Sequence, residues 1–174
     1  MASSYPTRNQ YQKIWKINDI TKNINTKGTH PSSFGDTAIF MGGNSDAASS
    51  MQEIDTVQIS TAGNSTDFGD LTAAKFDCGG MGGNFRGICT GGRTPSVINV
   101  IEYIHFASTG NGADFGDLTS ARLMVKSINN LTRGVTGSGA TPSNSNVIDF
   151  ITIQTLGNAV DFGDLTVARS RTGA

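Results

Sequence analysis

The six letters Asp-Phe-Gly-Asp-Leu-Thr could do chemistry, because an aspartate before Phe-Gly holds magnesium in protein kinases. They begin at Asp67 and recur in full at Asp114 and Asp161, 47 residues apart each time. A catalytic aspartate is needed once, whereas a motif copied at a fixed period marks a repeated structural unit. The chain also lacks a Gly-rich phosphate loop followed by a strand lysine, and it lacks a His-Arg-Asp loop. The motif therefore indicates a structural repeat and not a kinase site.

Histidines and paired carboxylates offer little further chemistry. His30 and His105 are the only histidines, and His105 falls where the neighbouring repeats have Gln and Thr, which is typical of an exposed strand position. Asp67 and Asp70 are spaced so that they could share a calcium ion, but the alternating acidic spacing of a calcium loop is absent. No Ser/His/Asp order, no paired Cys/His ligands and no GK[ST] loop appear. We therefore expect no enzyme, no metal site and no cofactor.

The fixed period also predicts the elements that carry the motif. Each unit begins with a strand that ends in glycines, as at 86–92, and continues with a strand rich in β-branched and aromatic residues, as at 100–107. A Gly-Asn turn then leads into Asp-Phe-Gly-Asp-Leu-Thr, and a short fourth segment closes the unit. We expect a non-repetitive arm at 1–36 and a β domain at 37–174. The repeats of this domain are predicted at 37–85, 86–132 and 133–174.

The composition favours an all-β fold of four-stranded repeats. Glycine accounts for 22 of 174 residues, charged residues for 16%, and no window has a sustained helical period. In the second unit, Ile101 and Tyr103 would lie on one face of a strand, and Ile104 and Phe106 on the other. A sheet that is apolar on two faces lies between neighbours, as the blades of a β-propeller do. The alternative is a three-sided β-prism within one chain.

Each residue type in the repeated motif has a predicted structural role. Phe68, Phe115 and Phe162 are expected to be equivalent buried anchors between sheets. The glycine that follows each of them permits a bulge or a positive φ, and the first aspartate is expected to accept hydrogen bonds from nearby backbone N–H groups. Propellers usually have about four to eight blades, so three units predict exposed sheet faces that are closed by oligomerisation.

The repeats resemble the kelch pattern of a double glycine, an acid followed by an aromatic residue, and a closing Ala-Arg. The third unit departs from the double glycine, the first unit closes with Ala-Lys, and phenylalanine replaces the usual tryptophan. The residues that carry the resemblance are Gly42-Gly43, Gly91-Gly92, Glu102-Tyr103, Asp149-Phe150, Ala121-Arg122 and Ala168-Arg169.

From Thr37 to its end the chain is also similar to kelch-like repeat structural proteins of marine bacteriophages, of the cyanophage and pelagiphage type. This resemblance implies a virion protein, made in the host cytoplasm, that decorates the capsid or forms part of a head or tail appendage. It implies other virion proteins and further copies of the chain as partners. The alternatives are a tail-fibre component that recognises a host-surface glycan and a cellular kelch adaptor.

The arm at 1–36 holds the single tryptophan, Trp15, and two of the three tyrosines, Tyr5 and Tyr11. It carries five Lys/Arg against two Asp, whereas the rest of the chain carries eight basic against twelve acidic residues. Aromatic residues contribute much of the energy of protein contacts, so we expect these three to bind another virion protein. Packing of the arm on the first repeat is the alternative. Its positive charges are too sparse to predict nucleic-acid binding.

The sequence contains no apolar run near the length that spans a membrane, and its first residues lack the apolar core of a signal peptide. We therefore expect no membrane partner and an origin in the cytoplasm. Cys78 and Cys89 are expected to be free thiols in that reducing compartment.

Overall fold

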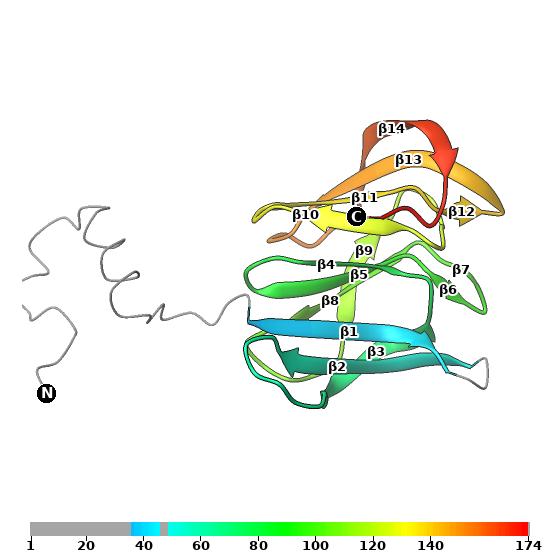
Figure 1. Ribbon diagram of the computed structural model, residues 1–174. Helices are drawn as coiled ribbons and strands as arrows, with labels where there is room; N and C mark the ends of the chain where they lie inside the picture. The colour runs from blue at the N-terminus through cyan, green and yellow to red at the C-terminus, as the bar shows by residue number, and fades with distance from the viewer. Residues whose placement is uncertain (1–35, 46–48, 174) are drawn as a thin grey trace, which may run out of the picture. The chain divides into compact units, whose positions relative to one another are not determined.

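The computed structural model describes residues 36–45 and 49–173, which form strands joined by turns and contain no helix (Figure 1). The predicted all-β class is confirmed. The described strands form antiparallel sheets, and no sheet closes into a barrel. Of the predicted arm, only Asp36 lies within the described residues.

The first sheet is a meander with the strand order β1-β2-β3. Its strands are β1 (Thr37–Asn44), β2 (Ser50–Gln58) and β3 (Thr66–Lys75). Phe40 of β1 lies opposite Asp55 of β2, and Met41 lies opposite Ile54. Directly opposed residues of antiparallel strands share one face of a sheet, so these two pairs lie on opposite faces.

The second and third sheets repeat this meander and add one strand before it. Their strand orders are β4-β5-β8-β9 and β10-β11-β13-β14, while β12 pairs with the start of β13, and β6 pairs with β7 in a short ribbon. The strands are β4 (Gly79–Gly82), β5 (Arg86–Thr90), β6 (Arg93–Thr94), β7 (Ser96–Val97), β8 (Val100–His105), β9 (Ala113–Asp117), β10 (Lys126–Asn129), β11 (Arg133–Gly137), β12 (Ala140–Thr141), β13 (Ser143–Thr152) and β14 (Val160–Arg169).

The segment predicted to close each repeat instead leads out of its own sheet, and its last residues open the next sheet. β4 lies in the predicted unit 37–85 but pairs with β5, and β10 lies in the predicted unit 86–132 but pairs with β11. Each junction between sheets is therefore a continuous run of chain from the last strand of one sheet to the first strand of the next. This differs from a closed four-stranded repeat, because the fourth strand of a sheet comes from the preceding unit.

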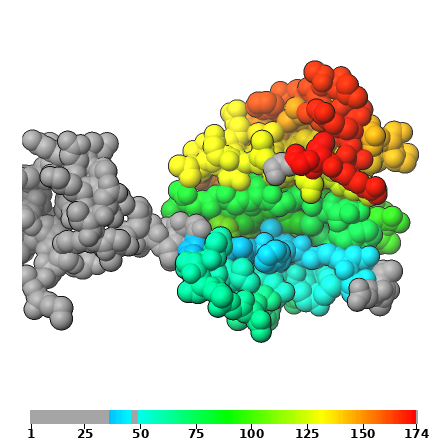
Figure 2. Space-filling view, in the orientation of Figure 1, coloured from blue at the N-terminus to red at the C-terminus, as the bar shows by residue number. Residues whose placement is uncertain are grey.

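The three sheets lie as successive layers in chain order, with the second sheet between the other two (Figures 1 and 2). One hydrophobic cluster lies between the first and second sheets and contains Ile54, Phe68 and Ile104. Another lies between the second and third sheets and contains Ile101 and Phe115. The predicted apolarity of the middle sheet on both faces is confirmed.

The two faces of each sheet are named here by chain direction. The C-face looks toward the following sheet, and in the second sheet it carries Ile101 and Tyr103. The N-face looks toward the preceding sheet, and in the second sheet it carries Ile104 and Phe106. In the first and third sheets, the residues at matching repeat positions define the same two faces. The third sheet thus has a C-face with no described sheet after it, and the first sheet has an N-face with none before it.

Candidate interaction surfaces

A buried ion pair joins the first sheet to the second. Lys75 Nζ lies 2.6 Å from Glu102 Oε2, and both side chains are almost completely buried. The other carboxylate oxygen of Glu102 accepts hydrogen bonds from the backbone N–H of Thr72, at 3.0 Å, and from its hydroxyl. A buried charge is costly unless it is paired and hydrogen-bonded, and this carboxylate has an ion pair as well as hydrogen bonds.

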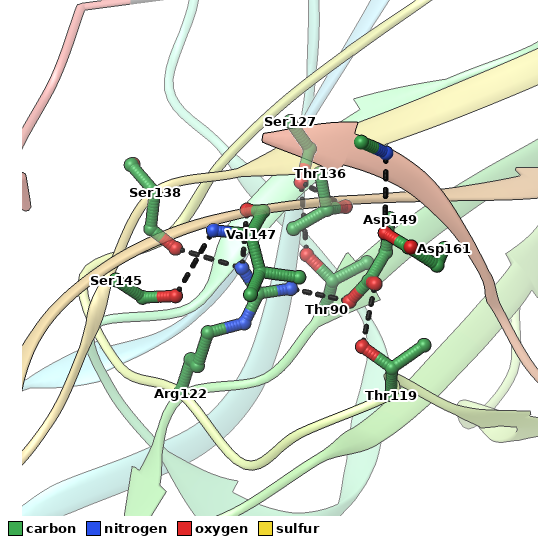
Figure 3. Close-up of polar contacts among 11 residues, drawn as sticks. Thr90, Thr119, Arg122, Ser127, Thr136, Ser138, Ser145, Val147, Asp149 and Asp161 are labelled. Atoms are coloured by element: carbon green, nitrogen blue, oxygen red, sulfur yellow. Dashed lines mark hydrogen bonds and ion pairs between the residues drawn. The ribbon is translucent and has the colours of Figure 1, made fainter. Parts of the chain in front are cut away.

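The same arrangement joins the second sheet to the third (Figure 3). Arg122 Nη2 forms an ion pair with Asp149 Oδ2, and both side chains are fully buried. Thr119 Oγ1 donates a hydrogen bond to Asp149 Oδ1 at 2.6 Å. Arg122 Nη1 also donates to the carbonyl oxygens of Ser138 and Val147, at 3.1 and 2.7 Å. Burial lowers the pKa of Arg122, and the charge of Asp149 opposes this effect.

Backbone contacts lock each Asp-Phe-Gly-Asp strand to the Gly-Asn turn of the next unit. The N–H of Gly110 donates to Phe68 O at 2.8 Å, and the N–H of Gly157 donates to Phe115 O at the same distance. The side chain of Asn111 accepts from the N–H of Asp70, as Asn158 does from Asp117. The predicted turn therefore forms a contact between units.

The glycine of the motif is explained by this contact. Gly69 and Gly116 have φ of 149° and 144°, at a bulge in the pairing with β2 and β8. A Cβ on either would lie 2.5 Å from backbone atoms of Gly110 or Gly157. The predicted positive φ and bulge are confirmed. Gly163 has the same backbone, with φ of 136°, but nothing lies within 4 Å of its Cβ position.

The three phenylalanines of the motif do not share one environment. Phe68 and Phe115 are 6% and 2% exposed and belong to the two clusters, as predicted. Phe162 is 53% exposed, so the prediction that it is a buried anchor is wrong. The physical reason is that the following sheet covers Phe68 and Phe115, whereas no described sheet follows the third. Phe162 instead packs edge-on against Phe150, with ring centroids 6.0 Å apart.

The C-face of the third sheet has the same kinds of residues as the C-faces of the first two sheets, but it is open to solvent. Ile128 is exposed there, whereas Met81 at the matching position of the second sheet is buried. A groove of about 460 Å³ runs along this face, lined by Val135, Gly137, Ile148, Leu165 and Arg169 among others. Arg169 stands at the position of Lys75 and Arg122, but it is exposed and has no ion pair with the described residues.

The N-face of the first sheet is the other open end. Phe40 and Ile59 are exposed on it. Asp55 lies opposite Phe40 and occupies the position of Glu102 and Asp149. It has no basic partner among the described residues. The N-face therefore carries an acid without a base, and the C-face of the third sheet carries a base without an acid.

The remaining candidate groups are His105, the two cysteines and the first aspartate of the motif. His105 is exposed, as predicted, and its ring packs edge-on against Tyr103. Cys78 and Cys89 are free thiols, and their hydrogen bonding lowers the pKa of Cys78 and raises the pKa of Cys89. The hydrogen bond predicted for the first aspartate of the motif is present in the third unit, where Asp161 Oδ1 accepts from the N–H of Gly163 at 3.1 Å within β14. No group of three acidic, histidine or cysteine side chains in the described part of the chain could hold a metal ion.

The predicted partner-binding residues Tyr5, Tyr11 and Trp15 lie outside the described residues. Sequence reasoning missed the buried pairs, although a signal was present. A base in the fourth segment and an acid in the next middle strand recur 27 residues apart, at Lys75 and Glu102 and again at Arg122 and Asp149. In the kelch pattern the bases and the acids are separate features, whereas the fold makes them partners.

Comparison with known protein families and with curated proteins finds no match for the chain. Among the residues that the structure describes, no helix has the length and apolar character needed to cross a membrane.

Proposed function

We propose that the chain is a non-enzymatic structural protein of a bacteriophage virion, which decorates the capsid or forms part of a head or tail appendage. The observation that carries this proposal is the open C-face of the third sheet. Apolar side chains on this face are exposed, although the side chains at matching positions are buried in the two internal contacts. Exposed apolar surface of this kind marks contact with another protein. The buried basic and acidic side chains pair with one another between successive sheets, as expected if their role is structural. The virion setting rests on the similarity of the repeats to those of marine bacteriophage structural proteins.

The three sheets are, in this proposal, consecutive blades of a kelch-like propeller. The second and third sheets support it, because each contains a four-stranded meander that packs face to face on its neighbour in chain order. A three-sided prism within one chain would need a core shared by all three sheets. The two clusters instead lie between successive sheets, which favours the propeller.

The arm at 1–36 is the proposed anchor to another virion protein, through Tyr5, Tyr11 and Trp15. The aromatic side chains supply contact energy, and the β domain would then be displayed outward or joined to neighbouring copies.

The test is to quantify the protein in purified particles of the phage that encodes it. We expect many copies per particle, retained after a salt wash, together with labelling of the capsid or an appendage by an antibody to the β domain. Absence of the protein from purified particles would overturn the proposal.

A second candidate function is recognition of a host-surface glycan as part of a tail fibre. The same groove supports it, because Lys126, Ser138, Arg169 and Thr172 line it with hydrogen-bonding groups. A glycan array with the wild-type protein and the Arg169→Ala variant separates the two functions. Binding that the variant loses would favour the glycan site, together with a low copy number per particle.

A further inference from the structure

We propose that the chain binds a second copy of itself end to end, with the N-face of one first sheet covering the C-face of the other third sheet. The second copy thereby continues the stack as a fourth sheet. This inference names a partner for the proposed assembly role, but it is argued from contacts within the chain, and its test needs no virion.

The C-face of the third sheet carries the residues that the two internal contacts use. Arg169 stands where Lys75 and Arg122 form buried ion pairs. Thr166 stands where Thr72 and Thr119 donate to the same carboxylates. Matching positions in the covered and open faces are Phe68, Phe115 and Phe162; Leu71, Leu118 and Leu165; and Ile54, Ile101 and Ile148. The first two members of each set are buried, and the third is at least partly exposed.

The N-face of the first sheet carries the complementary residues. Asp55 stands at the position of Glu102 and Asp149. Each of these two carboxylates forms an ion pair with a base of the preceding unit and accepts a hydrogen bond from a threonine hydroxyl of that unit. Gly63-Asn64 stands where the turns at 110–111 and 157–158 contact the preceding motif strand. Arg169 at one end and Asp55 at the other, each without an ion pair among the described residues, are therefore the two halves of the pair that the chain forms twice internally.

The motif glycine leaves room for such a turn. Gly69 and Gly116 are approached by the backbone of the next Gly-Asn turn, whereas the space above Gly163 is empty. All three have similar positive φ values, of 149°, 144° and 136°, so the third sheet keeps the backbone conformation of the contact without the contact itself. The turn at Gly63-Asn64 of a second copy fits this space.

Side-chain sizes are also matched between the two ends. At the first internal contact, Met41 on the C-face packs against the cluster that contains Cys89 on the N-face. At the second contact, Thr90 and Thr136 occupy these positions, and both hydroxyls lie 2.9 Å from Ser127 Oγ.

At the open ends, the matching positions hold Gly137 on the C-face and Phe40 on the N-face. As the N-face residue grows from Cys to Thr to Phe, the C-face residue shrinks from Met to Thr to Gly. Gly137 lines the groove of about 460 Å³, which provides space for Phe40 of a second copy. The two ends therefore complement each other in volume as well as in charge, which a packed contact requires.

The experiment is a charge exchange followed by sedimentation velocity over a rising series of protein concentrations. The full-length wild-type chain should associate as concentration rises, to a closed ring or to a longer stack, which are the two results of a head-to-tail contact. Arg169→Glu alone and Asp55→Lys alone should each weaken association by about 30-fold or more, because each leaves two like charges facing one another.

The decisive sample is an equimolar mixture of the two variants. The introduced glutamate of the Arg169→Glu variant faces the introduced lysine of the Asp55→Lys variant, so the two opposite charges attract and association should return. The chain that carries both exchanges should associate like the wild type, which is the matched control. Circular dichroism melts of dilute samples should show that all variants fold, since neither side chain has an ion pair within the described part of one chain.

Three results would overturn the inference. A wild-type chain that remains monomeric throughout would do so, and this includes the case in which residues 1–35 of the same chain cover the C-face. A mixture that associates no better than its components would exclude the Arg169 and Asp55 contact. Loss of association in Arg169→Glu but not in Asp55→Lys would indicate two C-faces in contact. None of these results bears on whether the protein is present in virions.

Discussion

Residues at matching repeat positions differ in how much they contribute to stability, because a following sheet buries only some of them. Arg122 and Arg169 follow the same Leu-Thr-x-Ala sequence, yet one is fully buried in an ion pair and the other is exposed. The chain thus supplies its own control for each substitution. The comparison separates the effect of burial from the effect of residue type.

Replacement of the buried arginine should be far more destabilising than replacement of the exposed one. Arg122→Ala leaves Asp149 as an unpaired buried charge, which typically costs about 3–5 kcal/mol. Arg169→Ala should change the free energy of unfolding by less than about 0.5 kcal/mol, as exposed substitutions do. Urea denaturation of dilute protein measures both. Equal effects would contradict the assignment of the buried pair.

The motif phenylalanines provide a second matched pair. Phe115→Ala removes a core ring and should cost about 3–5 kcal/mol. Phe162→Ala should cost about 1 kcal/mol or less in dilute solution, because the ring is already 53% exposed. The free energies of unfolding come from the same denaturant melts. A loss below about 1 kcal/mol for Phe115→Ala would contradict its role as an anchor.

At the scale of elements, the units are linked by the fit between a bulged strand and a turn. β9 carries Gly116, and the turn at Gly157 approaches it so closely that a side chain has no room. β14 carries Gly163 with the same φ but with open space. Replacing either glycine by alanine imposes the same kind of backbone strain. Only the added methyl group at position 116 would also clash with the neighbouring turn.

Gly116→Ala should therefore be more destabilising than Gly163→Ala. The shared strain at a positive φ costs about 1–3 kcal/mol in both variants. The clash with the turn should add about 1–3 kcal/mol for Gly116→Ala alone, as overpacking does. Thermal melts followed by circular dichroism compare the two proteins. If both variants lose the same stability, the contact between strand and turn is not tight.

The sequence was sufficient for the features that depend on local pattern. The period located the strands and the turns, and the alternation at Ile101, Tyr103, Ile104 and Phe106 assigned both faces of the middle sheet. It did not reveal which sheet β4 joins, because strand pairing is a tertiary choice that local residues do not encode. It also could not distinguish Phe162 from Phe115, since identical letters acquire different surroundings at the end of a stack.

The chain combines a stack of sheets with an N-terminal segment that lies outside the described residues. The contacts of the stack run between nearest neighbours, so its stability approximates a sum of terms for sheets and for the contacts between them. The terminal sheets each lack one such term, and interactions with other chains can supply it.

The N-terminal segment can be tested without disturbing the stack. Deletion of residues 1–30 removes Tyr5, Tyr11 and Trp15 and leaves every described strand intact. We expect the truncated protein to fold but to be lost from particles, because it lacks the aromatic side chains that we propose as its anchor. Circular dichroism and quantitative mass spectrometry of particles check the two parts. Normal copy number with the truncated protein would show that the segment is not the anchor.

The constant distance along the chain between contacting residues has a consequence for folding speed. Arg122 and Asp149 are 27 positions apart, and the asparagine side chains of the turns bind residues 41 positions away in both junctions. Inserting another copy of 86–132 would lengthen the protein without lengthening any loop that must close. Folding slows as the mean sequence separation of contacts grows, and here that separation would stay nearly constant. The protein can therefore gain units without a slower search for its native pairings.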